Sequence, residues 1–181
     1  MEILITQDRI AERIKELGRQ ITEDYRGRVP VLVGILKGSF VFLADLIRAI
    51  DIPVEIAFLA VSSYEGETES SGIVKIEKDI DYDIAGRDLI IVEDIVDTGL
   101  TLRYLEDFFS VRHPGSVRVV TLLHKAVERE EVVTLDYVGF EIPNVFVVGY
   151  GLDYGERYRN LPYVAVLSQE EIANSGVGDA G

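Results

Sequence analysis

The segment of this sequence that most restricts the fold is residues 90–101, which read Ile90-Ile91-Val92-Glu93-Asp94-Ile95-Val96-Asp97-Thr98-Gly99-Leu100-Thr101. The β-branched run Asp88–Val92 predicts a buried strand that delivers two acidic residues at its carboxyl end. Gly99 is free to take a positive φ, which allows a tight turn after the strand. The pattern from Thr101 to about Val111 predicts a helix, so the segment is expected to be a strand–turn–helix unit.

A turn of this kind is suited to binding an anionic ligand. In open α/β sheets, ligands bind beyond the carboxyl ends of the strands. Backbone N–H groups at the helix start, with the hydroxyls of Thr98 and Thr101, would form an anion site suited to a monophosphate. Glu93 and Asp94 would lie beside that phosphate, where carboxylates suit ribose hydroxyls, directly or through a metal. The alternative interpretation is a solvated acidic turn followed by an ordinary capped helix.

The rest of the chain alternates extended and helical patterns. Strands are expected at Val31–Leu36, Val54–Val61, Ser116–Leu123, Tyr137–Phe140 and Val145–Tyr150, and helices at Thr6 to about Arg26 and Phe40–Ile50. Thr6 and Ser39 are the expected N-caps of the two helices. This alternation predicts an α/β fold in which a parallel sheet is covered by helices on both faces. Ser62–Gly72 contains almost nothing to bury and is expected to be a long loop, of the kind that serves as a lid.

Composition narrows the function classes. The chain has 181 residues, 48% of them apolar, which fits a single domain with a substantial core. The net charge of −14 disfavours nucleic acids and anionic membranes as partners. With no Cys, neither a disulfide framework nor a thiolate metal site is possible. The start of the chain does not resemble a signal peptide, and no apolar run approaches the ~20 residues of a membrane helix. We therefore expect a cytoplasmic protein.

The full run from Leu89 to Thr101 resembles the phosphoribosyl-pyrophosphate signature of the type I phosphoribosyltransferases. That pattern is four hydrophobic residues, two acidic residues, three positions ending in Asp, and then Thr-Gly-x-Thr. The resemblance implies a parallel twisted sheet flanked by helices, with a core at about 8–140. A small hood is implied at about 1–7 and 141–170, and a frayed tail at 171–181. The implied contacts to the phosphoribosyl group and its 5′-phosphate are Glu93, Asp94, Asp97, Thr98, Gly99, Leu100 and Thr101.

Further segments resemble the hypoxanthine-guanine branch of that family, and the resemblance spans roughly Val31–Leu167. In the family, the loop matching Leu36-Lys37-Gly38-Ser39 binds pyrophosphate and contains a cis peptide before the Lys. The resemblance therefore implies pyrophosphate contacts from Lys37 and Gly38, and also from Arg159. The loop that starts at Ser63-Tyr64 is implied to close over the site during the reaction. A plain strand-to-helix turn and a surface aromatic residue are the ordinary alternatives for these two segments.

The same resemblance implies a purine subsite and a metal. The family counterpart of Lys125 donates to the oxygen at purine position 6, that of Phe146 stacks on the base, and that of Val147 offers backbone groups to it. Ile95 and Asp153 complete the implied purine-side set. Mg²⁺ is implied as the cofactor, with Glu93, Asp94 and Asp153 as ligands. Leu100 departs from the pattern, because some relatives have Lys there, and His124 receives no role.

The function that the resemblance implies is purine salvage. The enzyme would transfer the 5-phosphoribosyl group from phosphoribosyl pyrophosphate to N9 of hypoxanthine or guanine, giving IMP or GMP and pyrophosphate. Asp97 would accept the proton from purine N7, and the chain would form a homodimer or homotetramer. A preference for xanthine or another 6-oxopurine is one alternative. A regulator that only senses the donor is disfavoured by the presence of Asp97 and by the charge of −14. An unrelated nucleotide-binding domain is disfavoured because the sequence has neither Gly-x-Gly-x-x-Gly nor a Walker loop.

Overall fold

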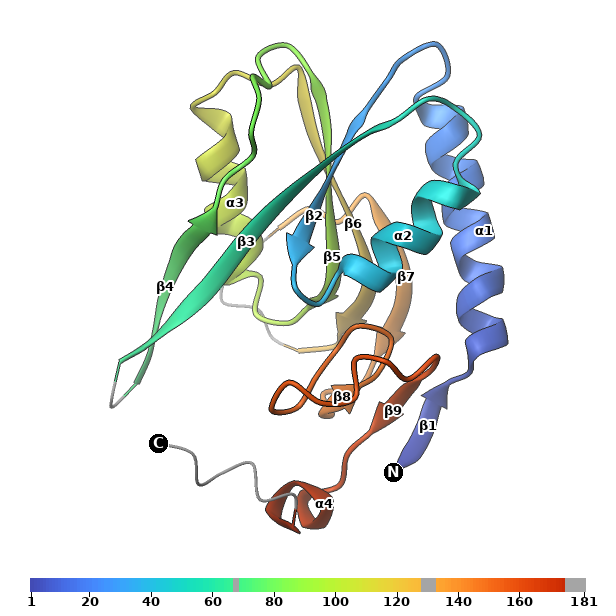
Figure 1. Cartoon of the computed structure of the whole chain (residues 1–181), viewed down its shortest axis with the longest axis vertical. Coiled ribbons are helices and arrows are strands. Elements are labelled where there is room, and N and C mark those ends of the chain that lie inside the picture. The colour runs from blue at the N-terminus through green and yellow to red at the C-terminus, as the bar shows by residue number, and fades with distance from the viewer. Residues whose placement is uncertain (67–68, 128–132, 175–181) are drawn as a thin grey trace.

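The computed structural model describes residues 1–66, 69–127 and 133–174, with the backbone alone for 63–66 and 69–73. Its main element is a six-stranded sheet with the order β4-β3-β2-β5-β6-β7 (Figure 1). The strands are β2 (Val31–Leu36), β3 (Glu55–Gly66), β4 (Glu69–Lys78), β5 (Asp88–Val96), β6 (Ser116–Lys125) and β7 (Tyr137–Ile142). All neighbouring pairs are parallel except β3 and β4. The predicted parallel sheet is therefore confirmed, with one antiparallel strand added at its edge.

Helices cover both faces of this sheet, as predicted. α1 (Gln7–Asp24) and α2 (Phe40–Ala49) pack on one face, and α3 (Leu100–Ser110) packs on the other. Successive residues of β5 point to opposite faces, so Ile90 joins the core beneath α1 and α2 while Leu89 joins the core beneath α3. Burial on both faces explains why β5 contains the unbroken apolar run from Leu89 to Val92.

Two polar residues precede the helices on the first face. Thr6 caps α1, because its hydroxyl accepts a hydrogen bond from the backbone N–H of Arg9 at 3.4 Å. Ser39 occupies the cap position of α2, but its hydroxyl instead donates to the carbonyl oxygen of Ile35 at 2.7 Å. The predicted side-chain cap at Ser39 is therefore wrong. Ser39 is fully buried, so its hydroxyl takes a carbonyl partner from the adjoining end of β2.

The segment Ser62–Gly72 differs from its prediction as a loop. β3 continues to Gly66 and β4 begins at Glu69, so most of this segment forms an antiparallel hairpin, in which Ser63 lies opposite Val74. The loop prediction is wrong because it rested on the scarcity of apolar residues. The hairpin projects beyond the rest of the sheet (Figure 1), and its two strands are paired in an antiparallel register.

A second, smaller sheet lies beyond the carboxyl ends of the main strands (Figure 1). It has the order β1-β9-β8, with β1 at Glu2–Ile5, β8 at Val147–Val148 and β9 at Val164–Val166. N-terminal and C-terminal segments therefore meet in this small sheet, and the predicted fold class is confirmed. The helix α4 (Gln169–Asn174) follows, so the first residues of the predicted frayed tail are helical, while 175–181 lie outside the described residues.

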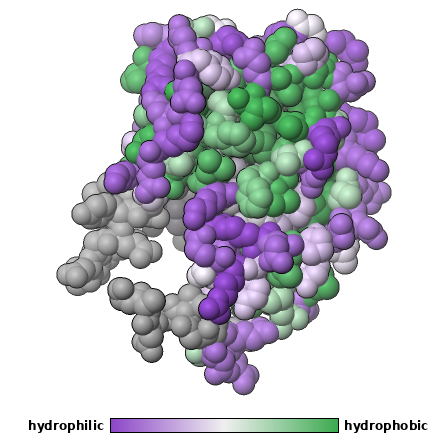
Figure 2. Space-filling view, viewed as in Figure 1, coloured by the Kyte–Doolittle hydropathy of each residue, from purple (hydrophilic) through white to green (hydrophobic). Residues whose placement is uncertain are grey.

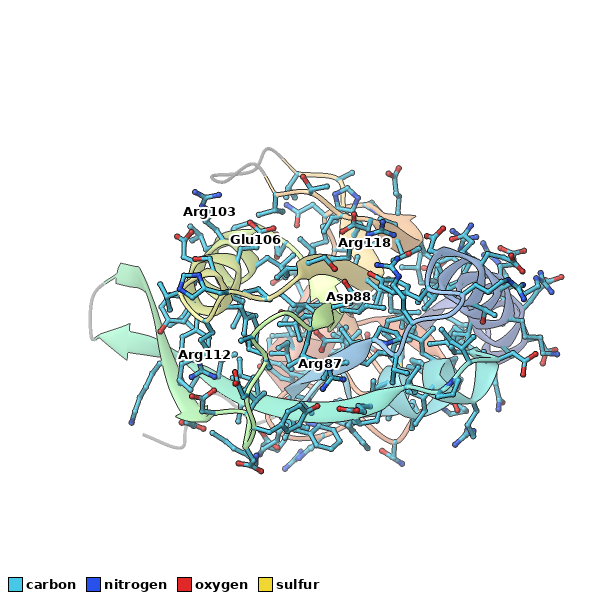
Figure 3. The ribbon with its side chains drawn as sticks, turned by 90° about the horizontal axis from the view of Figure 1, so that it is seen from above. Arg87, Asp88, Arg103, Glu106, Arg112 and Arg118 are labelled. Carbon is cyan, nitrogen blue, oxygen red and sulfur yellow. The ribbon has the colours of Figure 1, made fainter. Side chains whose placement is uncertain are left out.

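The amino end of the main sheet is crossed by ion pairs between loops and strand starts. Figure 3 looks down on this end and labels Arg87, Asp88, Arg112 and Arg118. The pairs are Arg28–Asp88 at 3.2 Å, Arg87–Glu55 at 3.0 Å, Arg118–Asp24 at 3.3 Å, and Arg112–Asp79. Each acidic residue in this set thus has an arginine partner, and the pairs join segments that are distant in the sequence.

Apolar surface gathers on the face over α2 and β3 (Figure 2). Each of these elements has a large exposed aromatic side chain, Phe40 in α2 and Phe58 in β3.

None of the described helices could span a membrane, since each of them is too short or too polar to cross a bilayer.

Candidate active site

Segments from four parts of the chain meet at the carboxyl end of the main sheet. They are the turn after β2, the turn between β5 and α3, the end of β6, and the loop between β8 and β9. Side-chain contacts join them in pairs: Lys125 of β6 contacts Asp97 after β5, and Lys37 after β2 contacts Glu156 of the long loop. The structure therefore brings most of the predicted site residues to one edge of the sheet, where ligands of α/β folds bind.

The turn between β5 and α3 encloses a hollow of about 110 Å³. Gly99 has a φ of 86°, the left-handed conformation that the sequence predicted it could take, and it places α3 directly after the turn. Thr98 accepts a hydrogen bond from the backbone N–H of Leu100 at 3.4 Å. The residues that line the hollow are Glu93, Ile95, Val96, Asp97, Thr98, Gly99, Thr101 and Leu102. A helix N-terminus facing such a hollow favours a small anion.

Lys125 and Asp97 form an ion pair beside this hollow. The Nζ of Lys125 donates to Oδ2 of Asp97 at 3.0 Å. Only 13% of the lysine side chain is exposed, against 49% of the aspartate. The sequence placed both residues in the site but did not predict this contact, because they are separated by 28 positions. The pair holds the lysine ammonium in a partly enclosed position from which it can donate to a second acceptor.

The aromatic residue expected to stack on a base is available at the surface. Phe146 is 41% exposed and meets the ring of Tyr154 edge to face, with centroids 5.5 Å apart. Val147, the next residue, is buried in β8 of the small sheet. An exposed ring fixed by an aromatic neighbour and by a buried strand can offer a flat apolar face to a planar ligand.

The backbone of the turn after β2 lies in close contact with two other segments, the end of β5 and the C-terminal loop. The peptide bond Leu36–Lys37 is cis, as the family resemblance implied. A Cβ added to Gly38 would lie 1.7 Å from Oδ2 of Asp94, and one added to Gly151 would lie 2.1 Å from the carbonyl oxygen of Gly38. No side chain larger than that of glycine fits at either position while these contacts stay as they are. Gly38 is thus pressed between the acidic end of β5 and the long C-terminal loop.

Arg159 is at the centre of a charged cluster in that C-terminal loop. Its Nη2 lies 3.0 Å from Oδ1 of Asp153 and 3.2 Å from Oε1 of Glu156, and its Nη1 donates to the carbonyl of Gly151 at 2.8 Å. The Nζ of Lys37 reaches the other oxygen of Glu156 at 3.0 Å. Lys37 and Arg159, both predicted to contact pyrophosphate, therefore share one carboxylate. Sequence reasoning missed Glu156, because an acidic residue in a polar turn carries no distinctive pattern.

The two acidic residues at the end of β5 are in an unfavourable electrostatic setting. Burial raises the pKa of Glu93 well above its usual value, and the neighbouring Asp94 raises it further. Burial also raises the pKa of Asp94 to about 6, although the backbone N–H of Ile95 and the charge of Arg159 oppose this shift. The charge of Asp153 adds to it. A cation or a hydrogen-bond donor that enters beside these groups would favour their ionised forms.

The predicted lid residues and the predicted metal ligands are less completely defined than the rest of the site. Ser63 and Tyr64 belong to β3 in the projecting hairpin, and their side chains lie outside the described part of the structure. Glu93, Asp94 and Asp153 do not form a ready metal centre, since no group of three His, Cys, Asp or Glu side chains that could hold a metal occurs within residues 1–66, 69–127 and 133–174. His124 lies with its Nδ1 3.6 Å from Glu141.

Comparison with known proteins identifies the family. The sequence matches the phosphoribosyl transferase domain over residues 2–155. It is 51% identical over 173 residues to the hypoxanthine-guanine phosphoribosyltransferase of Streptococcus pneumoniae, covering 96% of each chain. It is 54% identical over 169 residues to the protein of that name from Streptococcus agalactiae, covering 93% of this chain and 94% of that one. A hypoxanthine-guanine phosphoribosyltransferase crystal structure from Bacillus anthracis has a TM-score of 0.88 and 48% identity, covering 93% of this chain and 99% of that chain. The chain therefore belongs to the phosphoribosyltransferase family.

Proposed function

We propose that this chain is a purine salvage enzyme that transfers the 5-phosphoribosyl group from phosphoribosyl pyrophosphate to N9 of hypoxanthine or guanine. The products are IMP or GMP and pyrophosphate. The relatives described above carry the corresponding name. The observation that carries the proposal is the 3.0 Å contact between Lys125 and Asp97, which joins the end of β6 to the anion-binding turn after β5. A 6-oxopurine acceptor and a phosphorylated donor would meet at this junction.

The donor would bind along the turn after β5. Its 5′-phosphate fits the hollow at the start of α3, where backbone N–H groups and the hydroxyls of Thr98 and Thr101 are available. Its ribose hydroxyls would donate to Glu93 and Asp94, and these hydrogen bonds favour the ionised carboxylates. Lys37, Gly38 and Arg159 would take the pyrophosphate. This assignment explains how a chain with a net charge of −14 could bind a phosphate-rich donor. The cations and backbone dipoles would lie where the phosphates bind and would compensate for the repulsion from the acidic residues.

The purine would occupy the space between Lys125 and the aromatic residue Phe146. Lys125 would donate to the oxygen at position 6, which is an acceptor in hypoxanthine and guanine, whereas adenine presents an amino group there. The carboxylate of Asp97 would accept the N7 proton as N9 attacks C1 of the ribose and the bond from C1 to pyrophosphate breaks. Asp97 is also placed to stabilise the positive charge that develops on the sugar.

Magnesium is proposed as the cofactor, held by oxygen ligands from Glu93, Asp94 and Asp153 together with the donor. The residues fit a hard cation, because the charge of Asp153 contributes to the raised pKa of Asp94 and a cation beside these oxygens would oppose that shift. When bound, Mg²⁺ would neutralise the charge on the departing pyrophosphate. The donor has to supply part of the coordination, since the described side chains do not form a complete metal group by themselves.

Other features of the proposal concern the surroundings of the site. The outer part of the β3–β4 hairpin begins at Ser63 and Tyr64. We propose that this hairpin covers the bound substrates and excludes water from the reacting ribose. The homodimer or homotetramer, the cytoplasmic location and the division into a core and a hood stay predictions. Protection of residues 62–72 from limited proteolysis only when the donor and a base analogue are bound would support the covering role.

The direct test is to identify the nucleotide product. The protein is incubated with phosphoribosyl pyrophosphate, magnesium and one base at a time, chosen from hypoxanthine, guanine, xanthine, adenine and uracil. We expect IMP and GMP, and neither AMP nor UMP. Formation of XMP as the main product would favour the xanthine alternative. No nucleotide from any base, with the donor still bound tightly, would favour a protein that only senses the donor.

A further inference from the structure

Glu156 bridges the two cations that the proposed function assigns to pyrophosphate. Its Oε2 accepts from Nζ of Lys37 at 3.0 Å, and its Oε1 accepts from Nη2 of Arg159 at 3.2 Å. Lys37 is 119 positions away in the sequence, so the carboxylate joins the turn after β2 to the C-terminal loop. Each carboxylate oxygen serves one cation, and two neighbouring phosphate groups of a diphosphate could contact the same pair in this way.

Hydrogen bonds of the backbone keep the turn around Glu156 closed, and the Glu156 carboxylate takes no part in them. Glu156 has a φ of 64°, and its N–H donates to Oδ2 of Asp153 at 2.9 Å. Backbone hydrogen bonds at 3.1 and 3.2 Å between Tyr154 and Arg157 close the turn. The side chain is 64% exposed, so it can swing into solvent when another anion takes its place.

We propose that Glu156 is an internal competitor that occupies Lys37 and Arg159 in the free protein and lowers the affinity of this subsite for phosphate ligands. The inference rests on the proposed function, which places pyrophosphate at these two cations. Any entering anion has to break both contacts with Glu156. A diphosphate can replace them with one contact from each phosphate group, and the cost of displacing the carboxylate lowers its net affinity.

The test is a calorimetric titration of inorganic pyrophosphate and of orthophosphate, both with magnesium chloride present, into the native protein and Glu156→Gln. Gln keeps the size of the side chain and removes its charge. We expect pyrophosphate to bind about two- to tenfold more tightly to the variant, as suits the loss of two exposed ion pairs. Orthophosphate has to displace the same carboxylate, so its binding should be strengthened by a similar factor. The KM for phosphoribosyl pyrophosphate should decrease together with the dissociation constant of pyrophosphate.

The matched control is Glu23→Gln. Glu23 is an exposed acid that pairs with Arg26 near the carboxyl end of α1, so its replacement changes the net charge by the same amount. Binding of both anions to this variant should equal that of the native protein. If Glu23→Gln and Glu156→Gln strengthen pyrophosphate binding equally, a general charge effect explains the result and the proposed competition is overturned. Thermal unfolding of both variants checks that the fold is kept.

Two further variants separate this inference from the proposed function. Lys37→Ala and Arg159→Ala should weaken pyrophosphate binding. If both bind pyrophosphate as well as the native protein does, the pyrophosphate subsite itself is misplaced. If both lose affinity but Glu156→Gln is unchanged or binds more weakly, the subsite stands and the competitor role of Glu156 is wrong. Weaker binding by Glu156→Gln would instead show that the carboxylate positions the two cations for the ligand.

Discussion

The two ends of the main sheet hold acidic residues in opposite electrostatic settings. At the amino end, Asp79 accepts hydrogen bonds from Arg112, and these lower the pKa of its carboxyl group. At the carboxyl end, burial raises the pKa of Glu93 and Asp94. The charge of Arg159 opposes the shift at Asp94, but this arginine is already in contact with Asp153 and Glu156. The same residue types are thus paired at one end and held at an energetic cost at the other.

This difference distinguishes a structural role from a functional one. Because the pKa of Asp79 is lowered in the folded state, its pairing adds stability above pH of about 4, and this stability is lost as the pH falls further. The pKa of Asp94 is raised to about 6, so the folded state holds its proton more strongly than the unfolded state does. Stability therefore decreases as the pH rises from about 4 to 6. Groups retained at such a cost are candidates for ligand binding.

The largest effect is expected for Asp97→Asn at the carboxyl end. Asn keeps the size of the side chain and can still accept a hydrogen bond from Lys125, but it cannot take the purine proton. We expect kcat for IMP formation to fall by about 10²- to 10⁴-fold, with little change in donor affinity. Asp107→Asn, an exposed position on α3 that lies near Arg103, is the matched control and should be fully active. Near-normal turnover of Asp97→Asn with saturating substrates would remove Asp97 as the base.

A smaller effect is expected for Lys125→Ala, which removes the mostly buried ammonium group. The apparent affinity for hypoxanthine should fall by about 10- to 100-fold, as expected for loss of a charged hydrogen bond. Donor affinity should change far less, because Lys125 would bind the purine, and its contact with the donor side of the site is the hydrogen bond to Asp97. Steady-state kinetics with each substrate varied in turn would separate the two values. An unchanged KM for hypoxanthine would exclude Lys125 from the purine subsite.

The smallest effect is expected at the amino end, where Asp79→Asn should affect stability without affecting catalysis. Asp79 is 41% exposed, so solvent screens its pair with Arg112 and the expected loss is only about 0.5–1 kcal/mol. Urea unfolding should show this loss at pH 7, and the difference from the native protein should shrink as the pH falls below about 4, because the native carboxyl group then also becomes protonated. A loss of activity in Asp79→Asn would contradict the division of roles between the two ends.

Two segments at the carboxyl end of the sheet differ in how well the sequence predicted them. Residues 90–101 were predicted almost completely, because a strand buried on both faces and a glycine turn are encoded locally. The stretch from β8 to Arg159 was assigned by resemblance alone. Its geometry depends on the left-handed residues Tyr150, Glu156 and Tyr158, which no local pattern indicates. The contact of Glu156 with Lys37 also needs the chain to be folded, since 119 positions separate the two.

The β3–β4 hairpin is a second feature that the sequence did not predict. Its strands were predicted as a loop because Ser62–Gly72 has too few apolar residues to suggest burial. Pairing of β3 with β4 comes from backbone hydrogen bonds, which every residue except proline can form, so the sequence gives little sign of it. The packing of Gly38 between Asp94 and Gly151 was hidden for a related reason, because the need for glycine there arises from contacts between distant loops.

We infer that the carboxylates at the end of β5 are kept for the donor at the expense of stability, and Asp94→Asn separates these two effects. Donor binding in magnesium buffer is measured by calorimetry on the native protein and the variant, and their free energies of unfolding are compared at pH 7.5. We expect the variant to be more stable by about 1–3 kcal/mol, because a buried charge is removed, and to lose most of its donor affinity. A variant that is less stable than the native protein, or that binds the donor equally well, would show that Asp94 is not kept for the donor at the expense of stability.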